Sequence, residues 1–116
     1  MKLLIAGSRG IEDYDLSPYV PEETSLIISG GAKGIDLVAE RYADRHHIKK
    51  QIVKPEYTLY GRSAPLVRNR QMVEMADRVL VIWDGKSRGT QYAVQYAEKQ
   101  GKPVEVILCV PQTDKK

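Results

Sequence analysis

Short apolar runs alternate with stretches of helical spacing along almost the entire chain, and this alternation limits the possible folds more than any other feature. We predict strands at residues 3–6, 26–28, 79–83 and 104–110, where the runs are apolar or nearly so, and a weaker strand at 51–53. Strands that helices cover on both faces carry such continuous runs. These segments therefore predict a buried parallel sheet.

The segments between the predicted strands have the spacing of amphipathic helices. We predict helices at residues 33–47, 65–76 and 89–100. A short helix is also expected within residues 11–25, an acidic segment with two prolines, because it would complete the first crossover. The alternation of strand and helix predicts the α/β class: a three-layer domain with a parallel sheet of about five strands.

The length of 116 residues fits one domain, which we place at residues 1–110, with a polar tail at 111–116. No apolar run approaches the ~18 residues that a membrane span requires, and the apolar start is too short for a signal peptide. The single cysteine, Cys109, has no second cysteine with which to form an internal disulfide. We therefore predict a cytoplasmic protein with no membrane partner.

The charge distribution favours a local anion site over a broad nucleic-acid surface. The formal net charge is only +3, yet residues 61–70 contain three arginines and no acidic residue. His46 and His47 are adjacent, with no cysteine or acidic cluster at ligand spacing, so no metal site is predicted. No cofactor is predicted either.

Three of the predicted strands end in glycine-rich turns, at residues 7–10, 29–34 and 85–90. Because the carboxyl ends of parallel strands lie at one edge of a sheet, we expect these turns to meet there. Glycine lets the backbone approach a ligand closely, and the N–H groups that begin the next helix favour an anion. Each turn also carries a cation, namely Arg9, Lys33 or Arg88. Together the turns predict a site for a phosphate-bearing ligand.

The common nucleotide motifs do not match these turns. A P-loop requires a glycine five residues before its Gly-Lys-Ser, but Leu80 occupies that position ahead of Gly85. A dinucleotide site requires an acidic residue at the end of the second strand, where this chain has Ser29 and Gly30. We therefore expect neither an ordinary P-loop ATPase nor an ordinary NAD-dependent dehydrogenase.

Five motifs in order carry a resemblance to a known family: residues 5–9 (IAGSR), 29–36 (SGGAKGID), 60–72 (YGRSAPLVRNRQM), 76–77 (AD) and 85–90 (GKSRGT). Their sequence and spacing resemble the YspA-like branch of the SLOG superfamily, which is similar to the DprA (Smf) and LOG proteins. The resemblance covers roughly residues 2–107. It implies a Rossmann-like fold that binds nucleotides or nucleotide-derived ligands.

The branches of this superfamily differ in activity. LOG enzymes cleave the N-glycosidic bond of nucleoside monophosphates, whereas DprA-type proteins bind single-stranded DNA. By this resemblance the Gly30–Gly31 and Gly89–Thr90 turns match phosphate-binding positions, and Arg70 matches an active-site arginine of the LOG motif. LOG enzymes carry two glutamates in the pattern Gly-Thr-x-Glu-Glu. Here Tyr92 and Ala93 occupy those positions, so the phosphate-binding turns are present and the acids are absent.

The candidate site residues come from the three turns and from the arginine-rich segment between them. The candidate ligand-binding residues are Gly7, Ser8, Arg9, Gly30, Gly31, Lys33, Gly34, Asp36, Tyr60, Arg68, Asn69, Arg70, Asp84, Gly85, Ser87, Arg88, Gly89 and Thr90. If the protein is catalytic, the candidate residues are Asp36, Asp84 and Arg70. Tyr57 and Tyr60, in the loop expected before the helix at residues 65–76, are candidates for stacking on a base.

Three functions remain open from the sequence. The first is binding of a nucleotide or nucleotide-derived small molecule, as a sensor or sequestering module. The second is a nucleotide-processing enzyme, related to N-glycosidases, with a relocated acid. The third is binding of single-stranded DNA in the manner of DprA, for which the chain offers only a short basic track. A homodimer or larger assembly is also predicted, with Tyr92 and Tyr96 as interface candidates.

Overall fold

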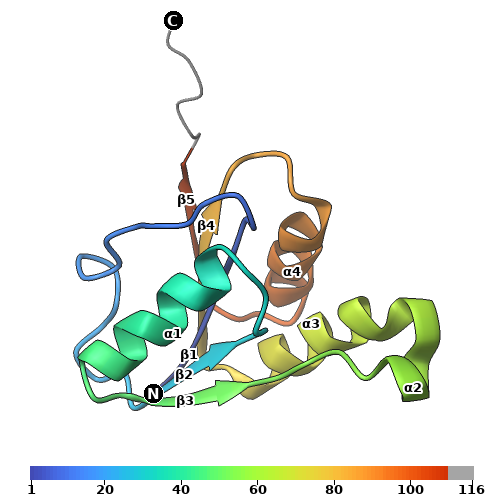
Figure 1. The fold of residues 1–116 in the computed structure, drawn as a ribbon, viewed down its shortest axis with the longest axis horizontal. Coiled ribbons are helices and arrows are strands. Elements are labelled where there is room, and N and C mark those ends of the chain that lie inside the picture. Colours follow the sequence, from blue (N-terminus) through green and yellow to red (C-terminus); the bar gives the residue numbers. More distant parts are fainter. Residues whose placement is uncertain (110–116) are drawn as a thin grey trace, which may run out of the picture.

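A parallel sheet of five strands forms the centre of the structure, a computed structural model that describes residues 1–109 (Figure 1). The strand order is β3-β2-β1-β4-β5, and every neighbouring pair is parallel. The strands are β1 (Lys2–Gly7), β2 (Leu26–Ser29), β3 (Lys49–Ile52), β4 (Arg78–Trp83) and β5 (Val104–Leu108). This confirms the predicted α/β class, with a Rossmann-like arrangement. The predicted tail at 111–116 lies outside the described residues.

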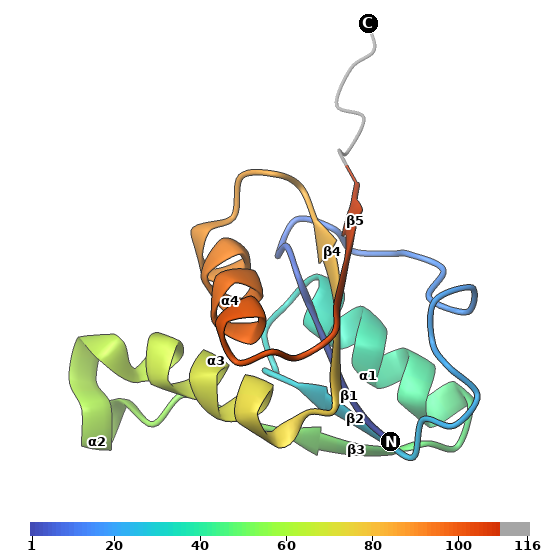
Figure 2. The ribbon, with the colours of Figure 1, turned by 180° about the vertical axis from the view of Figure 1, so that it is seen from behind.

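Helices cover both faces of this sheet (Figures 1 and 2). One face packs against α1 (Ile35–Arg45), and the other against α3 (Ala64–Met75) and α4 (Arg88–Lys99). Alternate residues of the central strands supply the two cores: Leu3 and Ile5 point toward α1, whereas Leu4 packs with the residues of α3 and α4. None of these three side chains has exposed surface, which explains why the sequence of a central strand is a continuous apolar run.

The expected helix within residues 11–25 is wrong, because the described structure contains only turns and irregular backbone there. The Asp15 carboxylate accepts hydrogen bonds from both the backbone N–H and the hydroxyl of Ser17, which compete with helical bonding. Pro18 and Pro21 lack the N–H groups that a helix would need. The segment nevertheless covers the sheet, since Leu16 is 1% exposed and belongs to the core on the α1 face.

The stretch between β3 and α3 also differs from the prediction of a loop. It contains a short helix, α2 (Tyr57–Tyr60), and a 3₁₀ turn at Gly61–Ser63 that leads directly into α3. Both lie beyond the body of the domain, at one end of its longest axis (Figures 1 and 2). The strand before them begins two residues earlier than predicted, at Lys49. No helix of the described residues is long and apolar enough to cross a membrane.

Candidate functional site

The three glycine-rich turns meet at the carboxyl edge of the sheet, as the sequence predicted. A hollow of about 220 Å³ brings together Gly7 at the end of β1, Ala32 in the turn after β2, and Gly89 in the first turn of α4, which follows β4. Strands β1 and β4 are neighbours, but the chain leaves them toward opposite faces of the sheet. In open α/β sheets such a switch point is where ligands bind.

Two adjoining hollows make up this site. The first, of about 220 Å³, is lined by Ala6, Gly7, Arg9, Ala32, Asp36, Pro65, Arg68, Asn69, Met72, Ser87, Gly89, Thr90 and Ala93. The second, of about 240 Å³, is lined by Arg9, Gly30, Gly31, Ala32, Lys54, Pro55, Tyr57, Pro65 and Arg68. The two hollows share four residues, and two of these are the arginines Arg9 and Arg68. The shared boundary therefore carries two positive charges.

Close backbone contacts explain why glycine occurs in these turns. A Cβ atom at Gly7 would lie 2.2 Å from the carbonyl oxygen of Ile82 and 2.8 Å from the Ile35 side chain. At Gly34, where φ is +81°, a Cβ atom would lie 2.4 Å from the carbonyl oxygen of Ser8. These two glycines thus let the start of α1 dock against the turn after β1.

Ser8 joins the turns after β1 and β4 to the start of α1. Its backbone N–H donates to the Ile82 carbonyl, and its own carbonyl accepts from the N–H of Ile35 at 3.2 Å. Its hydroxyl oxygen accepts a 2.9 Å hydrogen bond from the backbone N–H of Asp84. Ser8 is 1% exposed and lines neither hollow, so it connects the turns around the site without facing the hollows itself.

Asp36 and Arg68 form the buried charged part of the site. The Arg68 guanidinium donates to the Gly30 carbonyl at 2.7 Å and to the Val53 carbonyl at 3.3 Å, while the Asp36 carboxylate accepts the Ala32 N–H at 3.1 Å. A Cβ atom at Gly30 would lie within 3.0 Å of both charged groups, at 2.7 Å from Arg68 Nη1 and 2.9 Å from Asp36 Oδ2. Gly30 therefore provides the space in which the two side chains approach each other.

Burial shifts the protonation equilibria of both groups. It raises the pKa of the Asp36 carboxyl to about 6, even though the Ala32 N–H and the Arg68 charge oppose this shift. Burial also lowers the pKa of Arg68, and the Asp36 charge works against that change. Asp36 is thus a carboxyl group that takes up and releases a proton close to neutral pH, within reach of a ligand.

The raised pKa of Asp36 predicts a pH dependence of folding stability. The unfolded carboxyl has a pKa of about 3.9, so the folded state binds more protons between about pH 4 and pH 6, and stability falls as the pH rises through that window. We expect Asp36→Asn to remove this loss, so that at pH 7 its free energy of unfolding exceeds that of the wild type by roughly 1–3 kcal/mol. Urea unfolding at about pH 4 and pH 7 measures the difference. An equal effect of the variant at both pH values would contradict the assignment.

The two helices that begin at the site differ in how their first N–H groups are used. At α1 the N–H of Ile35 donates to Ser8, and Asp36 already places a carboxylate in the first turn. At α4 the first turn contains no acidic residue, and the side chain of Ser87 makes no capping hydrogen bond. Because the unpaired N–H groups of a helix start attract anions, the start of α4 is the more suitable position for a phosphate.

Several predicted site residues lie outside both hollows. Lys33 lines a separate hollow beside Glu12 and Arg41, and Tyr60, Arg70, Gly85 and Arg88 line neither hollow of the site. Arg70 is exposed on α3 and lines neither hollow, whereas Arg68, two residues earlier on the same helix, lines both. Gly34 lies buried beneath the site against Ser8 and Arg9.

Asp84 stabilises its own turn. Its carboxylate accepts the backbone N–H groups of Lys86 at 2.8 Å and Ser87 at 3.0 Å, and these hydrogen bonds lower the pKa of the carboxyl. A carboxylate with a lowered pKa is a weak base, and Asp84 lines neither hollow. Of the two candidate acidic groups, the structure therefore brings only Asp36 to the site.

The second hollow contains residues that the sequence interpretation did not assign, most importantly Lys54 and Pro65. Tyr57 lines this hollow, whereas its neighbour Tyr60 does not. Lys54 follows the edge strand β3, whose carboxyl end lies at the same edge of the sheet as the three turns. The position of Lys54 after a predicted parallel strand was the available signal, although no glycine-rich turn marks it.

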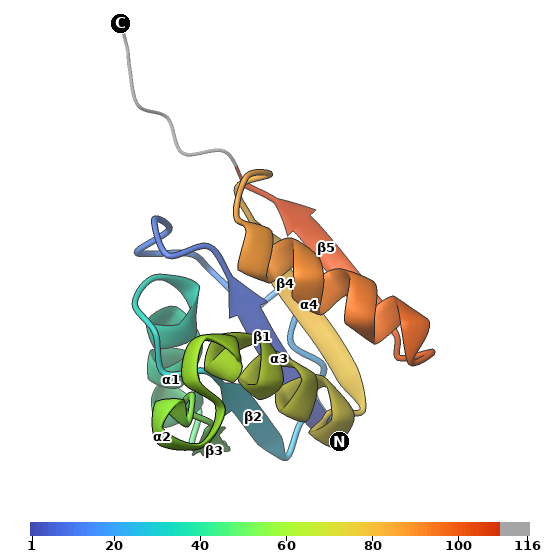
Figure 3. The same cartoon turned by 90° about the vertical axis from the view of Figure 1, so that its right-hand side faces the viewer.

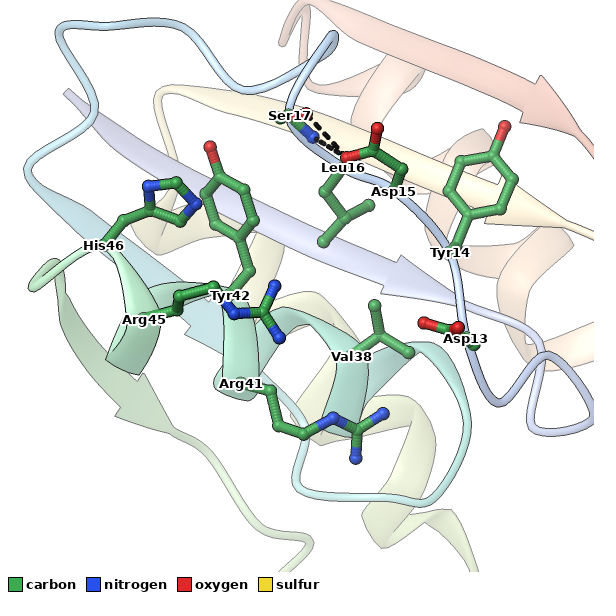
Figure 4. Close-up of a pocket in the computed structure, with 10 residues that line it drawn as sticks. All are labelled: Asp13, Tyr14, Asp15, Leu16, Ser17, Val38, Arg41, Tyr42, Arg45 and His46. Carbon is green, nitrogen blue, oxygen red and sulfur yellow. Dashed lines mark hydrogen bonds between the residues drawn. The ribbon is translucent and has the colours of Figure 1, made fainter.

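A larger hollow, of about 410 Å³, lies elsewhere, between residues 13–17 and α1 (Figure 4). Several of its polar groups already have partners: Asp15 accepts hydrogen bonds from Ser17, Arg41 donates to the Glu12 carbonyl, and Tyr42 stacks on His46. None of the glycine-rich turns contributes to it. Volume alone therefore does not make it the better site.

The Gene 61 protein of Mycobacterium phage D29 is similar to this chain. The two sequences are 31% identical over 120 residues, a match that covers 89% of this chain and 93% of the phage protein. No protein-family model matches the chain.

Proposed function

This chain belongs to the family of the Gene 61 protein of Mycobacterium phage D29, and we propose that it binds a nucleotide or another nucleotide-derived, phosphate-bearing small molecule. The ligand would occupy the two adjoining hollows at the carboxyl edge of the sheet. In this proposal the protein acts as a sensor or sequestering module for that ligand.

The observation that carries the proposal is the start of α4, which lines the first hollow together with two arginines. Gly89 and Thr90 lie in the first turn of α4, and both line the hollow together with Arg9 and Arg68. Backbone N–H groups and guanidinium groups are the donors that proteins use for phosphate. No heavy atom of residues 1–109 outside α4 and its flanking residues lies within 4 Å of the Cβ position of Gly89, so the space beside this residue is open.

The second hollow supports a ligand larger than phosphate. Tyr57 offers an aromatic ring there, and Lys54 adds a cation beside the Gly30–Gly31 turn. A phosphate at the shared arginines would leave this hollow for a base or sugar, and aromatic rings stack on bases without regard to sequence.

A second candidate function is hydrolysis of the bound nucleotide, which the position of Asp36 favours. Its carboxyl lines the first hollow, and burial brings its pKa to about 6, near the value that suits a general acid or base. The test is whether the protein releases free base or phosphate from a nucleoside monophosphate. If Asp36 performs this step, Asp36→Asn should retain binding and lose the release.

The proposed binding predicts a difference between two cations of the glycine-rich turns. Arg9 lines both hollows, whereas Lys33 lines neither. A hydrogen bond to a charged group contributes about 1.5–3 kcal/mol, so we expect Arg9→Ala to weaken binding by ~10- to 100-fold. Lys33→Ala is the matched control and should leave the affinity within about twofold.

Calorimetric titration with the four common nucleoside 5′-monophosphates measures both variants against the wild type. The corresponding nucleosides, which lack the phosphate, should bind poorly to all three proteins. Equal losses in Arg9→Ala and Lys33→Ala would indicate that overall charge, and not this site, attracts the ligand. Failure of every monophosphate to bind would contradict the proposal for this ligand class.

A further inference from the structure

The two outer edges of the sheet differ in how they are protected against another strand. At one edge β3 carries Lys49, Lys50 and Gln51, and edge lysines discourage pairing with a second sheet. At the other edge β5 carries a single charge, Glu105, and it exposes 41% of Val106 and 63% of Leu108. The β5 edge is therefore apolar and open to pairing within the part of the chain that the structure describes.

The hydrogen bonds of β5 show which of its backbone groups face outward. The carbonyl of Pro103 accepts from Val79, and the N–H of Cys109 donates to the Trp83 carbonyl, so the odd-numbered residues bond to β4. Strand geometry then turns the N–H and carbonyl groups of Val104, Val106 and Leu108 toward the free edge. Three donors and three acceptors thus lie in a row along β5.

We propose that β5 pairs antiparallel with β5 of a second copy of this chain, about a twofold axis at Val106. This proposal does not depend on the ligand. In this register Val106 lies opposite the partner's Val106, and Val104 lies opposite the partner's Leu108. Both are hydrogen-bonded pairs, so every outward-facing group of β5 gains a partner and the two sheets become one sheet of ten strands.

The charge of Glu105 selects this register among the alternatives. A twofold axis at Val106 sets Glu105 opposite the partner's Ile107, which separates the two carboxylates. An axis at Glu105 would instead set two like charges directly opposite each other, which is destabilising. An axis at Ile107 would match fewer residues of β5, because Val104 would have no opposite residue within the strand. Only the axis at Val106 pairs all five residues.

The exposed side chains of β5 also gain cover from this arrangement. Val104 packs with the core beneath α3 and α4, so Val106 and Leu108, two and four residues further on, point toward the same face. Figure 3 shows α4 beside β5 on that face. A twofold axis perpendicular to the sheet places the α4 helices of both copies on one side, with the apolar side chains of β5 between them.

Tyr92 and Tyr96, the residues expected at an interface from the sequence, are less suited to this role. Their rings stack on each other at 6.4 Å, and the Tyr96 hydroxyl donates to the Glu74 carboxylate of α3. Both are only partly exposed, so their contacts lie largely within one copy of the chain.

The first test uses proline at matched positions on the two edges. We expect the wild type to have twice the monomer mass in light scattering and Val106→Pro to be monomeric, because proline removes an N–H that faces the partner and makes no bond to β4. Lys50→Pro is the control, since the Val53 N–H bonds to Ser29 and Lys50 therefore faces outward from β3. This control should remain dimeric. Val106→Lys, which keeps the N–H and adds a charge, should also be monomeric.

The second test determines the register by disulfide formation, in a Cys109→Ala background. Residues 105 and 107 of opposite copies form a non-hydrogen-bonded pair, whose Cα atoms lie about 4.5 Å apart and are close enough for a disulfide. We expect the double variant Glu105→Cys/Ile107→Cys to oxidise to a covalent dimer, and neither single variant to do so.

Each of three other outcomes would overturn the proposed dimer. A wild type that is monomeric up to millimolar concentration excludes the dimer. A dimer that persists in folded Val106→Pro and Val106→Lys must use another surface. Covalent dimers of Glu105→Cys alone or Ile107→Cys alone would show a different register. Circular dichroism of each variant establishes that it is folded.

Discussion

Replacing Gly34 by alanine is expected to destabilise the fold by about 2–5 kcal/mol, because overpacking and a strained left-handed backbone act together. The residue has φ +81°, and an added Cβ atom would lie 2.4 Å from the Ser8 carbonyl oxygen and 2.5 Å from the Arg9 Cα. Both contacts are backbone atoms, so neither can be relieved by rotating a side chain. Thermal unfolding should show a midpoint lower by roughly 10 °C or more.

Gly10 provides the control for this prediction. It lies in the turn after β1, it is exposed, and its Cβ position has no heavy atom within 4 Å. Gly10→Ala should therefore change the stability by less than about 0.5 kcal/mol. If Gly34→Ala unfolds at the same temperature as Gly10→Ala, the close docking of α1 against the turn after β1 is wrong.

Replacing Arg68 by methionine is expected to cost about 2–4 kcal/mol of stability at neutral pH. The substitution keeps an apolar stem of similar length, but it leaves the carbonyl groups of Gly30 and Val53 without their donor. It also removes the positive charge beside the buried Asp36 carboxyl, which makes ionisation of that carboxyl less favourable and should raise its pKa further from about 6.

The pH dependence separates these two contributions. Below about pH 4 Asp36 is protonated in the folded state of both proteins, so only the hydrogen-bond loss remains and the difference between variant and wild type should shrink. Denaturant unfolding of the wild type, Arg68→Met, Asp36→Asn and the double variant, each at neutral pH and at about pH 4, measures the coupling free energy between the two residues. Arg70→Met, two residues along the same helix and exposed, should have little effect. A loss for Arg68→Met that does not change with pH would contradict the electrostatic coupling.

Much of the fold could be predicted because the central strands are buried on both faces. Leu3, Leu4 and Ile5 are fully buried in succession, a pattern that a surface strand cannot show. The meeting of the glycine-rich turns at one edge then followed from parallel strand direction alone. Among the five strands, the edge strand β3 was predicted least accurately, because all four of its residues are exposed and its apolar pattern is correspondingly weak.

The positions of Arg68 and Arg70 show that the site prediction did not take account of helical phase. Two residues correspond to about 200° of rotation around a helix, so these side chains point to nearly opposite sides of α3. Ala64 and Met72 lie four residues before and after Arg68, and both are buried, which places Arg68 on the inward face. The same spacing was visible in the sequence. The resemblance to an enzyme motif predicts a role for Arg70, whereas helical phase predicts that Arg68 is the arginine on the inward face.

The irregular crossover at residues 11–25 was not predictable in the same way. Its two buried core residues, Ile11 and Leu16, are five positions apart, and Leu16 is isolated between polar neighbours, so neither a helical nor a strand period is present. The segment is held instead by side-chain bonds such as that from the Ser17 hydroxyl to Asp15, which a periodicity argument does not detect.

The bonding of Ser8 has a thermodynamic consequence for the ligand. Through its backbone and hydroxyl, this one buried residue links the turn after β1, the turn after β4 and the first residue of α1. The loops around the site are therefore ordered when the chain folds and not when a ligand arrives, so association would lose little conformational entropy in the protein. Binding should accordingly leave amide hydrogen exchange in these turns nearly unchanged, except where a phosphate oxygen accepts an N–H directly.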